Sequence, residues 1–154
     1  MSLKVGIVGA AGYAGAELIR LVLGHPEFEL VAITSNADAG QPLSAVYPSF
    51  AGVSDLAFTT HDNPELKTCD AVFLAVPHTA AMAQVPSLLA AGVSCIDLSA
   101  DYRLNDPATF EAWYAAEHTS PELLKSRAFG LPELFCQELE TAASDHADGK
   151  PVLV

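Results

Sequence analysis

Near its start the chain reads Lys4-Val5-Gly6-Ile7-Val8-Gly9-Ala10-Ala11-Gly12-Tyr13-Ala14-Gly15, and this stretch decides the fold. The short apolar run over residues 4–8 predicts a buried strand. Three glycines at a spacing of three follow it, and they lead into a segment with helical periodicity that Gly24 and Pro26 end. We therefore expect a strand, a tight glycine turn and a helix at the start of the chain.

Similar apolar runs recur along the rest of the sequence. They predict further strands at residues 28–34, 56–60, 71–76, 93–98 and 152–154. Residues 35–55 are predicted to be a loop with little regular structure. Three predicted helices each have an apolar face, formed by Leu18, Leu21 and Val22, by Met82, Val85 and Leu89, and by Phe110, Trp113 and Tyr114. Pro86 is expected to kink or restart the second of these helices. The third is predicted to begin at Pro107, and two further short helices are predicted to begin at Pro121 and Pro132. Alternating strands and helices predict a doubly wound, mostly parallel α/β sheet with helices on both faces.

Composition excludes several classes of function. The 154 residues suffice for one domain, and 19 acidic against 7 basic residues give a net charge of −12. Such a surface argues against binding nucleic acid or anionic membranes, and no apolar run reaches the length of a membrane span. Three cysteines without a close pair, and histidines without ligand spacing, predict no disulfide framework, no metal site and a cytoplasmic location.

The glycine turn predicts a dinucleotide site. Gly9 permits a tight turn, Gly12 lets the backbone approach a pyrophosphate, and Gly15 lets the helix pack closely on the strand. The start of the helix, at Tyr13 and Ala14, supplies unpaired amides for the phosphates. The alternative is a glycine-rich turn that binds no ligand.

The end of the second predicted strand bears on the choice between NADP and NAD. An NAD site usually offers a carboxylate there for the ribose hydroxyls, whereas this chain has Thr34-Ser35-Asn36. Ser35 and Asn36 offer hydrogen bonds to a 2′-phosphate, so NADP is favoured over NAD, with Asp38 assigned to the loop. The alternative is that these polar residues have no ligand role.

Four segments carry a resemblance to a known family. They are Gly9 to Leu18, Ala75-Val76-Pro77-His78, Leu98-Ser99-Ala100-Asp101-Tyr102-Arg103-Leu104 and Phe129-Gly130-Leu131-Pro132-Glu133-Leu134. In this order they resemble the N-acetyl-gamma-glutamyl-phosphate reductases of the semialdehyde dehydrogenase superfamily. The resemblance covers essentially the whole chain and implies a Rossmann-type NAD(P)-binding domain over residues 1–154.

The resemblance also implies a reaction. These enzymes use NADPH to reduce N-acetyl-glutamyl 5-phosphate to the 5-semialdehyde in arginine biosynthesis, through a thioester on a cysteine expected just after Val154. On this reading the chain is a fragment that lacks the catalytic half of a homo-oligomeric protein. Many relatives carry Arg at the position of Asn36 and Ser or Thr at that of Ala11. Two alternative functions stay open: an enzyme related to the aspartate-semialdehyde or acetylaminoadipyl-phosphate reductases, and a non-catalytic dinucleotide sensor.

The remaining candidates each have two interpretations. Pro77-His78 follows a strand and either contacts the nicotinamide half of the cofactor or caps the next helix. Ser99 ends another strand and is expected to contact cofactor or phosphate. Arg103 either binds the acyl-phosphate substrate or pairs with Asp101 or Asp106. Cys69 and Cys95 are predicted to lie in the core. Cys136 begins a predicted helix, where it is either a nucleophile or, as we favour, a packing residue. The aromatic stripe of Phe110, Trp113 and Tyr114 is predicted to be core or subunit interface.

Overall fold

The computed structural model describes residues 2–154, which fall into two compact parts, residues 2–75 and 76–154. The N-terminal part contains β1 (Leu3–Val8), α1 (Tyr13–Leu23), β2 (Phe28–Thr34), α2 (Leu43–Val46), η1 (Pro48–Phe50), η2 (Pro64–Thr68) and β3 (Ala71–Leu74). The C-terminal part contains η3 (Ala81–Ala83), α3 (Val85–Ala90), β4 (Ser94–Asp97), α4 (Pro107–Tyr114), η4 (Pro121–Lys125) and α5 (Pro132–Ala147).

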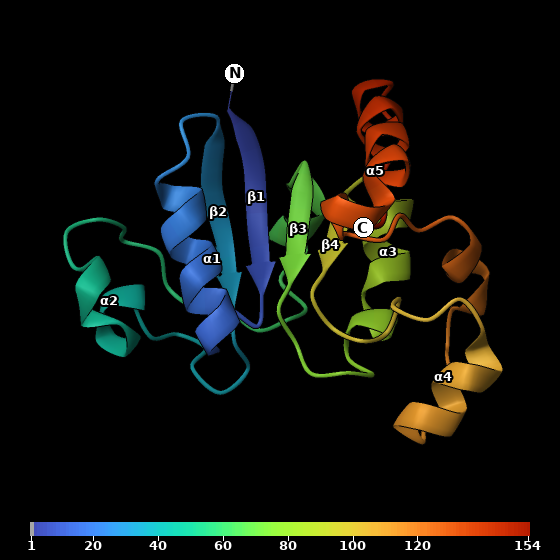
Figure 1. Cartoon of the computed structure of the whole chain (residues 1–154). Helices are drawn as coiled ribbons and strands as arrows, with labels where there is room; N and C mark the ends of the chain where they lie inside the picture. Colours follow the sequence, from blue (N-terminus) through green and yellow to red (C-terminus); the bar gives the residue numbers. More distant parts are fainter. Residues whose placement is uncertain (1) are drawn as a thin grey trace. The chain divides into compact units, whose positions relative to one another are not determined.

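In the N-terminal part β1 lies between β2 and β3 and runs parallel to both (Figure 1). Val8 is in register with Thr34 on one side and with Leu74 on the other. All three strands therefore end at the same edge of the sheet, and the segments that follow them meet there. The predicted α/β class with parallel strands is confirmed.

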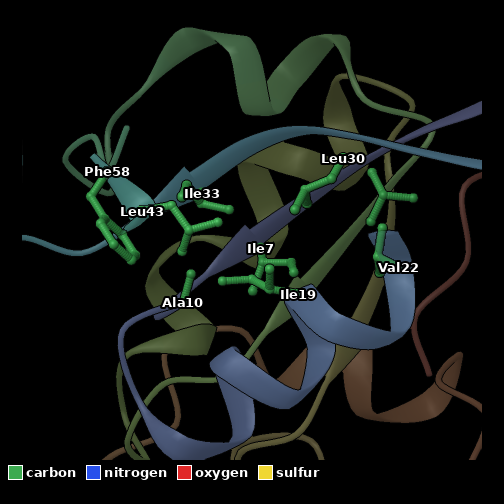
Figure 2. Packing of buried hydrophobic residues seen from close by; sticks show 9 residues of the cluster. Ile7, Ala10, Ile19, Val22, Leu30, Ile33, Leu43 and Phe58 are labelled. Carbon is green, nitrogen blue, oxygen red and sulfur yellow. The ribbon is translucent and has the colours of Figure 1, made fainter. Parts of the chain in front are cut away.

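A buried apolar cluster joins α1 to this sheet (Figure 2). Its members are Val5, Ile7, Ala10, Ile19, Val22, Leu30, Ile33, Leu43 and Phe58. The predicted helix was placed correctly, but its buried face is centred on Ile19 and Val22, and Leu21 is 52% exposed. Leu43 and Phe58 show that the segment after β2 closes one end of the core.

That segment departs from the prediction in two ways. Residues 35–55 contain the short helices α2 and η1, where an irregular loop was expected. Residues 56–60 form no strand, because each side of the segment pairs only once: Thr59 bridges to Thr34 in parallel and Ala57 to Pro42 in antiparallel fashion. Neither bridge continues into a ladder, so the segment stays outside the sheet.

In the C-terminal part β4 and the segment at 152–154 are joined by a single parallel bridge between Cys95 and Leu153. The strand predicted at 152–154 is therefore reduced to one bridge. Pro86 marks the start of α3, which confirms the restart. Asp106 caps α4 by accepting from the amide of Thr109 at 2.9 Å, as the Asp-Pro pair predicts.

The last proline-led helix, α5, has 16 residues, longer than expected, with a kink at Phe135. Within the predicted aromatic stripe, Phe110 is fully buried, whereas Trp113 is 79% exposed and is not core.

Gly15 makes the close approach of α1 possible, and this yields a testable expectation. A Cβ atom at Gly15 would lie 2.5 Å from the carbonyl oxygen of Gly9 and 2.6 Å from Cα of Ala10. Both neighbours are backbone atoms, so Gly15→Ala must displace the helix, and we expect a loss of about 1–3 kcal/mol in the free energy of unfolding. Gly24→Ala is the control, since a Cβ there meets nothing closer than 3.4 Å. Urea denaturation showing equal losses for the two variants would contradict this account.

Candidate functional site

The glycine turn follows β1 at the carboxyl edge of the sheet. Gly9 has a φ of +79°, a left-handed conformation that glycine adopts without strain. The amides of Gly9 and Ala10 both donate to the carbonyl of Thr34, at 3.1 and 2.9 Å. The turn is thereby fastened to the last residue of β2, and the two segments are held side by side.

The N-terminus of α1 has the features of an anion site. Gly12 is its N-cap and provides no side chain, and the first turn has no acidic residue. Among the bonds of residues 2–154, none uses the amides of Tyr13, Ala14 or Gly15 as donors. Unpaired amides and the positive end of the helix dipole favour a negatively charged group at this place. Tyr13 is 97% exposed, whereas Gly15 is buried.

A residue that the sequence did not single out holds the turn from the other side. The half-buried Tyr47, which follows α2, donates its hydroxyl to the carbonyl of Ala11 at 2.6 Å. Ala11 itself has no side-chain donor for a phosphate, as expected. Tyr47 comes from the segment predicted to be irregular, so no periodic signal pointed to it.

Ser35 and Asn36 follow β2 beside the glycine turn, but their polar groups are partly engaged. The hydroxyl of Ser35, which is 8% exposed, donates to the carboxylate of Asp38 at 2.7 Å. The side-chain carbonyl of Asn36 accepts from the amide of His61 at 3.0 Å, which leaves the exposed Asn36 with its NH2 group as a donor. Asp38 was assigned to the loop, but its carboxylate also binds the Ser35 hydroxyl at the end of β2.

His61 also belongs to this end of the sheet, although the sequence gave no reason to choose it. Its Nδ1 lies 2.7 Å from the hydroxyl of the buried Thr34. Burial lowers the pKa of His61, which favours the neutral ring. The ring thus fixes the strand end without adding a positive charge.

In the C-terminal part the predicted residues gather around a turn at 77–82. Pro77 and His78 are exposed, and the His78 ring lies 5.7 Å from the ring of Tyr114. His78 does not cap the next helix: the amides of Thr79 and Met82 donate instead to the carboxylate of Asp101, at 2.6 and 2.9 Å. The helix-capping interpretation of His78 is therefore wrong.

Ser99 and Arg103 lie next to this turn. The Ser99 hydroxyl donates to Asp97 at 2.9 Å and accepts from the amide of Asp101 at 3.1 Å. The exposed Arg103 reaches the carbonyl of Ser99 at 3.4 Å and the hydroxyl of Tyr114 at 3.5 Å. Neither Asp101 nor Asp106 forms the expected ion pair with Arg103, so its guanidinium keeps donors for an anion.

A cavity of about 430 Å³ opens beside these residues. It is lined by Ser99 and Arg103 together with Asp97, Phe129 and Val154, among others. Burial raises the pKa of Asp97, although its hydrogen bonds to Ser99 oppose that shift. Ser99 and Arg103 thus share one concave surface with a cation on its wall, whereas Pro77 and His78 are not part of its lining.

None of the three thiols has the character of a nucleophile. Burial raises the pKa of Cys69 to about 11 and that of Cys95 to about 12. Cys136 is exposed, which contradicts its predicted packing, and its hydrogen bond to the Glu140 carboxylate at 3.3 Å raises the pKa of the thiol. All three are therefore held as thiols near neutral pH.

Two kinds of site are not found in the part of the chain that the structure describes. No group of three or more His, Cys, Asp or Glu side chains between residues 2 and 154 is arranged to hold a metal ion. In the same stretch, no helix combines the length and apolar character needed to cross a membrane.

The Tyr47 hydroxyl gives a testable expectation for the turn. Tyr47→Phe removes one hydrogen bond to the Ala11 carbonyl, and we expect the free energy of unfolding to fall by about 1 kcal/mol. Tyr13→Phe removes the same hydroxyl from a side chain that projects into solvent, so it should leave stability unchanged. Thermal denaturation in which the two variants cannot be told apart would show that Tyr47 does not support the turn.

The chain matches known proteins over most of its length. Residues 4–142 match the family described as semialdehyde dehydrogenase, NAD binding domain. N-acetyl-gamma-glutamyl-phosphate reductase of Herminiimonas arsenicoxydans is 57% identical over 132 residues, which cover 86% of this chain and 38% of that protein. The protein of that name from Laribacter hongkongensis is 49% identical over 140 residues, covering 91% of this chain and 41% of that protein. The chain thus spans about two fifths of the length of these relatives.

Solved structures agree with the fold. Aspartate semialdehyde dehydrogenase with NADP from Candida albicans matches with a TM-score of 0.60 and 25% identity, over 70% of this chain and 32% of that one. A probable aspartate-semialdehyde dehydrogenase from Pseudomonas aeruginosa matches with a TM-score of 0.52 and 20% identity, over 99% of this chain and 55% of that one. With the family match over residues 4–142, these findings show that the chain belongs to the NAD-binding domain family of the semialdehyde dehydrogenases.

Proposed function

We propose that residues 1–154 are the NADP(H)-binding domain of a cytoplasmic reductase that converts N-acetyl-glutamyl 5-phosphate to the 5-semialdehyde in arginine biosynthesis. The observation that carries this proposal is the glycine turn with free amides at the start of α1. The substrate is inferred from relatives that are 46–57% identical and are named N-acetyl-gamma-glutamyl-phosphate reductases.

Each part of the turn has a task in this proposal. The amides of Tyr13, Ala14 and Gly15 would bind the pyrophosphate, and Gly12 leaves room for it because it has no side chain. Tyr47 keeps the turn in place through the Ala11 carbonyl. The nicotinamide, when bound, supplies the hydride for the reduction.

The choice of NADP over NAD rests on the end of β2. The free NH2 group of Asn36 is suited to donate one hydrogen bond to a 2′-phosphate. This hydrogen bond does not require a cationic side chain at position 36. The Ser35 hydroxyl is already committed to Asp38, so Ser35 contributes less than its sequence suggested. The NADP named in the structure of the Candida albicans relative supports the same choice, and the Asp38 carboxylate opposes it.

The substrate would lie against the C-terminal part. Arg103 has free donors for a carboxylate or phosphate of the acyl phosphate, and it reaches Ser99 and the hydroxyl of Tyr114. The nucleophilic cysteine is proposed to come from sequence beyond Val154 in the whole protein, which we expect to be a homo-oligomer. The aspartate and acetylaminoadipyl rivals are disfavoured because the most similar relatives discussed above bear the N-acetyl-gamma-glutamyl name.

Cofactor titration of the 154-residue chain tests the binding proposal. We expect measurable NADPH binding, with Asn36→Arg tightening it about tenfold, since a charge-assisted hydrogen bond to the 2′-phosphate contributes about 1.5–3 kcal/mol. Binding of NADH, which has no 2′-phosphate, should stay nearly constant in the same variant. Calorimetry without heat for NADPH would refute dinucleotide binding, and an equal gain for both cofactors would place the ribose elsewhere.

The thiols predict that this chain alone does not catalyse the reaction. Cys69 and Cys95 are buried and Cys136 is hydrogen-bonded to a carboxylate, so no thiolate is available to attack an acyl carbon. The assay is phosphate-dependent reduction of NADP with the semialdehyde, run on residues 1–154 and on a full-length relative as positive control. Turnover by the 154-residue chain that vanishes in Cys136→Ser would overturn this expectation. A chain that binds NADPH but whose full-length form never turns over would instead support the non-catalytic sensor.

A further inference from the structure

A second cavity, of about 570 Å³, lies in the C-terminal part and is larger than the cavity beside Ser99. All of its lining residues fall between positions 105 and 153, so the whole cavity belongs to one compact part of the chain. None of the candidate site residues predicted from the sequence lines it. Its volume is in the range of cavities that bind small organic molecules.

Part of the lining is an apolar wall made of four buried residues. They are Leu124 of η4, Ala128, Ala142 of α5, and Leu153, which bridges to β4. The amide of Ala128 donates to the carbonyl of Leu153 at 2.8 Å and joins two of the segments that form the wall. An apolar group of a ligand would be removed from water against these side chains.

The guanidinium of Arg127 is held at a fixed place in the same lining. The Arg127 side chain is only 9% exposed. Its Nη2 donates to the Arg103 carbonyl at 3.3 Å and to the side-chain oxygen of Asn105, and its Nη1 lies 3.9 Å from Oε2 of Glu138. The guanidinium carbon lies 5.3 Å from the centre of the Phe129 ring. These contacts fix the orientation of the charged group.

One donor of this guanidinium has no acceptor. Nε of Arg127 is buried, and it is the one buried side-chain nitrogen or oxygen between residues 2 and 154 that is found without a hydrogen-bond partner. An unpaired buried donor costs free energy, and in folded proteins such groups usually have a partner that the chain itself does not provide. The fold thus leaves a charged N–H for an acceptor from outside the chain.

The charges around the cavity limit what that acceptor can be. Asp145 is paired with Lys150 at 2.6 Å, and Glu138 lies next to Arg127 and also accepts from the Phe129 amide at 3.1 Å. The exposed Lys125 lines the cavity too, and in the described stretch 2–154 it takes part in no salt bridge. One positive charge is therefore unpaired, while the two carboxylates would repel a ligand with two negative charges.

We propose that this cavity binds a small monocarboxylate with an apolar body. The carboxylate pairs with the ammonium of Lys125 and accepts from Nε of Arg127, since its two oxygens can serve one donor each. The apolar body lies against the apolar wall. This inference does not rest on the proposed function, because no residue of the glycine turn takes part in it.

The first test compares three probes by calorimetric titration of the 154-residue chain. Hexanoate is the monocarboxylate, hexanamide is its neutral counterpart of nearly the same shape, and hexyl phosphate is mostly a dianion at neutral pH. We expect hexanoate to bind more tightly than the other two by about fivefold, the upper end for an ion pair with an exposed lysine. Equal affinities for hexanoate and hexanamide, or tighter binding of hexyl phosphate, would overturn the proposal.

Lys125→Met and Lys67→Met form a matched pair of variants. Each lysine is exposed and lies in the last turn of a five-residue 3₁₀ helix, Lys125 in η4 and Lys67 in η2, but Lys67 is far from the cavity lining in sequence and not part of it. Lys125→Met should weaken hexanoate binding by about fivefold and leave hexanamide unchanged, whereas Lys67→Met should change neither. Equal weakening by both variants would mean that hexanoate responds only to the net charge of the chain, and the proposal would fall.

The Nε–H signals of the three arginines in a ¹⁵N NMR spectrum locate the ligand without any Arg127 variant. Hexanoate should move the Arg127 signal to lower field and slow its exchange with water, while the signal of Arg20 stays constant. A shift at Arg103 alone would place the ligand in the cavity beside Ser99 and refute the site at Arg127. Absence of both heat and a shift at Arg127 with hexanoate would refute it as well, whatever the NADPH titration shows.

Discussion

The structure of the N-terminal part depends on one steric constraint, the contact between the start of α1 and the turn that precedes it. The site of a Cβ atom on Gly15 is only 2.5 Å from the Gly9 carbonyl oxygen, so helix and turn touch backbone to backbone. This contact allows Ile19 and Val22 to reach the sheet and close the core around Ile7. It also aims the first amides of α1 at the edge where β1 and β2 end. Packing and ligand site therefore share a single requirement, a residue without a side chain.

The helices and strands that could be predicted from the sequence are those with a strong local sequence pattern. β1, α1 and β2 were predicted almost to the residue, because a glycine turn between an apolar run and a helical pattern has few alternative structures. The segment after β2 was misjudged, since Leu43, Tyr47 and Phe58 act through contacts with residues far away in the sequence. Single bridges such as Thr34 with Thr59 have no periodicity, so no pattern separates them from a strand.

The site shows the same division. The positions of the predicted residues follow from the strand ends, but the state of their polar groups does not. Ser35 was predicted to donate a hydrogen bond to a ligand, whereas its hydroxyl already donates to the carboxylate of Asp38. Arg103 was predicted either to bind the substrate or to pair with Asp101 or Asp106, whereas the carboxylate of Asp101 accepts from two amides and forms no ion pair with it. Residue type and spacing cannot decide between such competing acceptors, because the choice depends on how the folded backbone directs each side chain.

The charge of the chain explains why backbone amides recur as donors in both parts. With a net charge of −12 and 7 basic residues, side-chain cations are scarce, and Arg20, Arg127 and Lys150 are paired with acidic neighbours. An anionic ligand approaching such a surface is repelled at long range. At short range the unpaired amides of α1 provide fixed dipoles that favour a negatively charged group and oppose that repulsion. Amides also satisfy the buried Asp101, since those of Thr79 and Met82 both donate to its carboxylate, so a turn supplies backbone N–H groups where no cation is at hand.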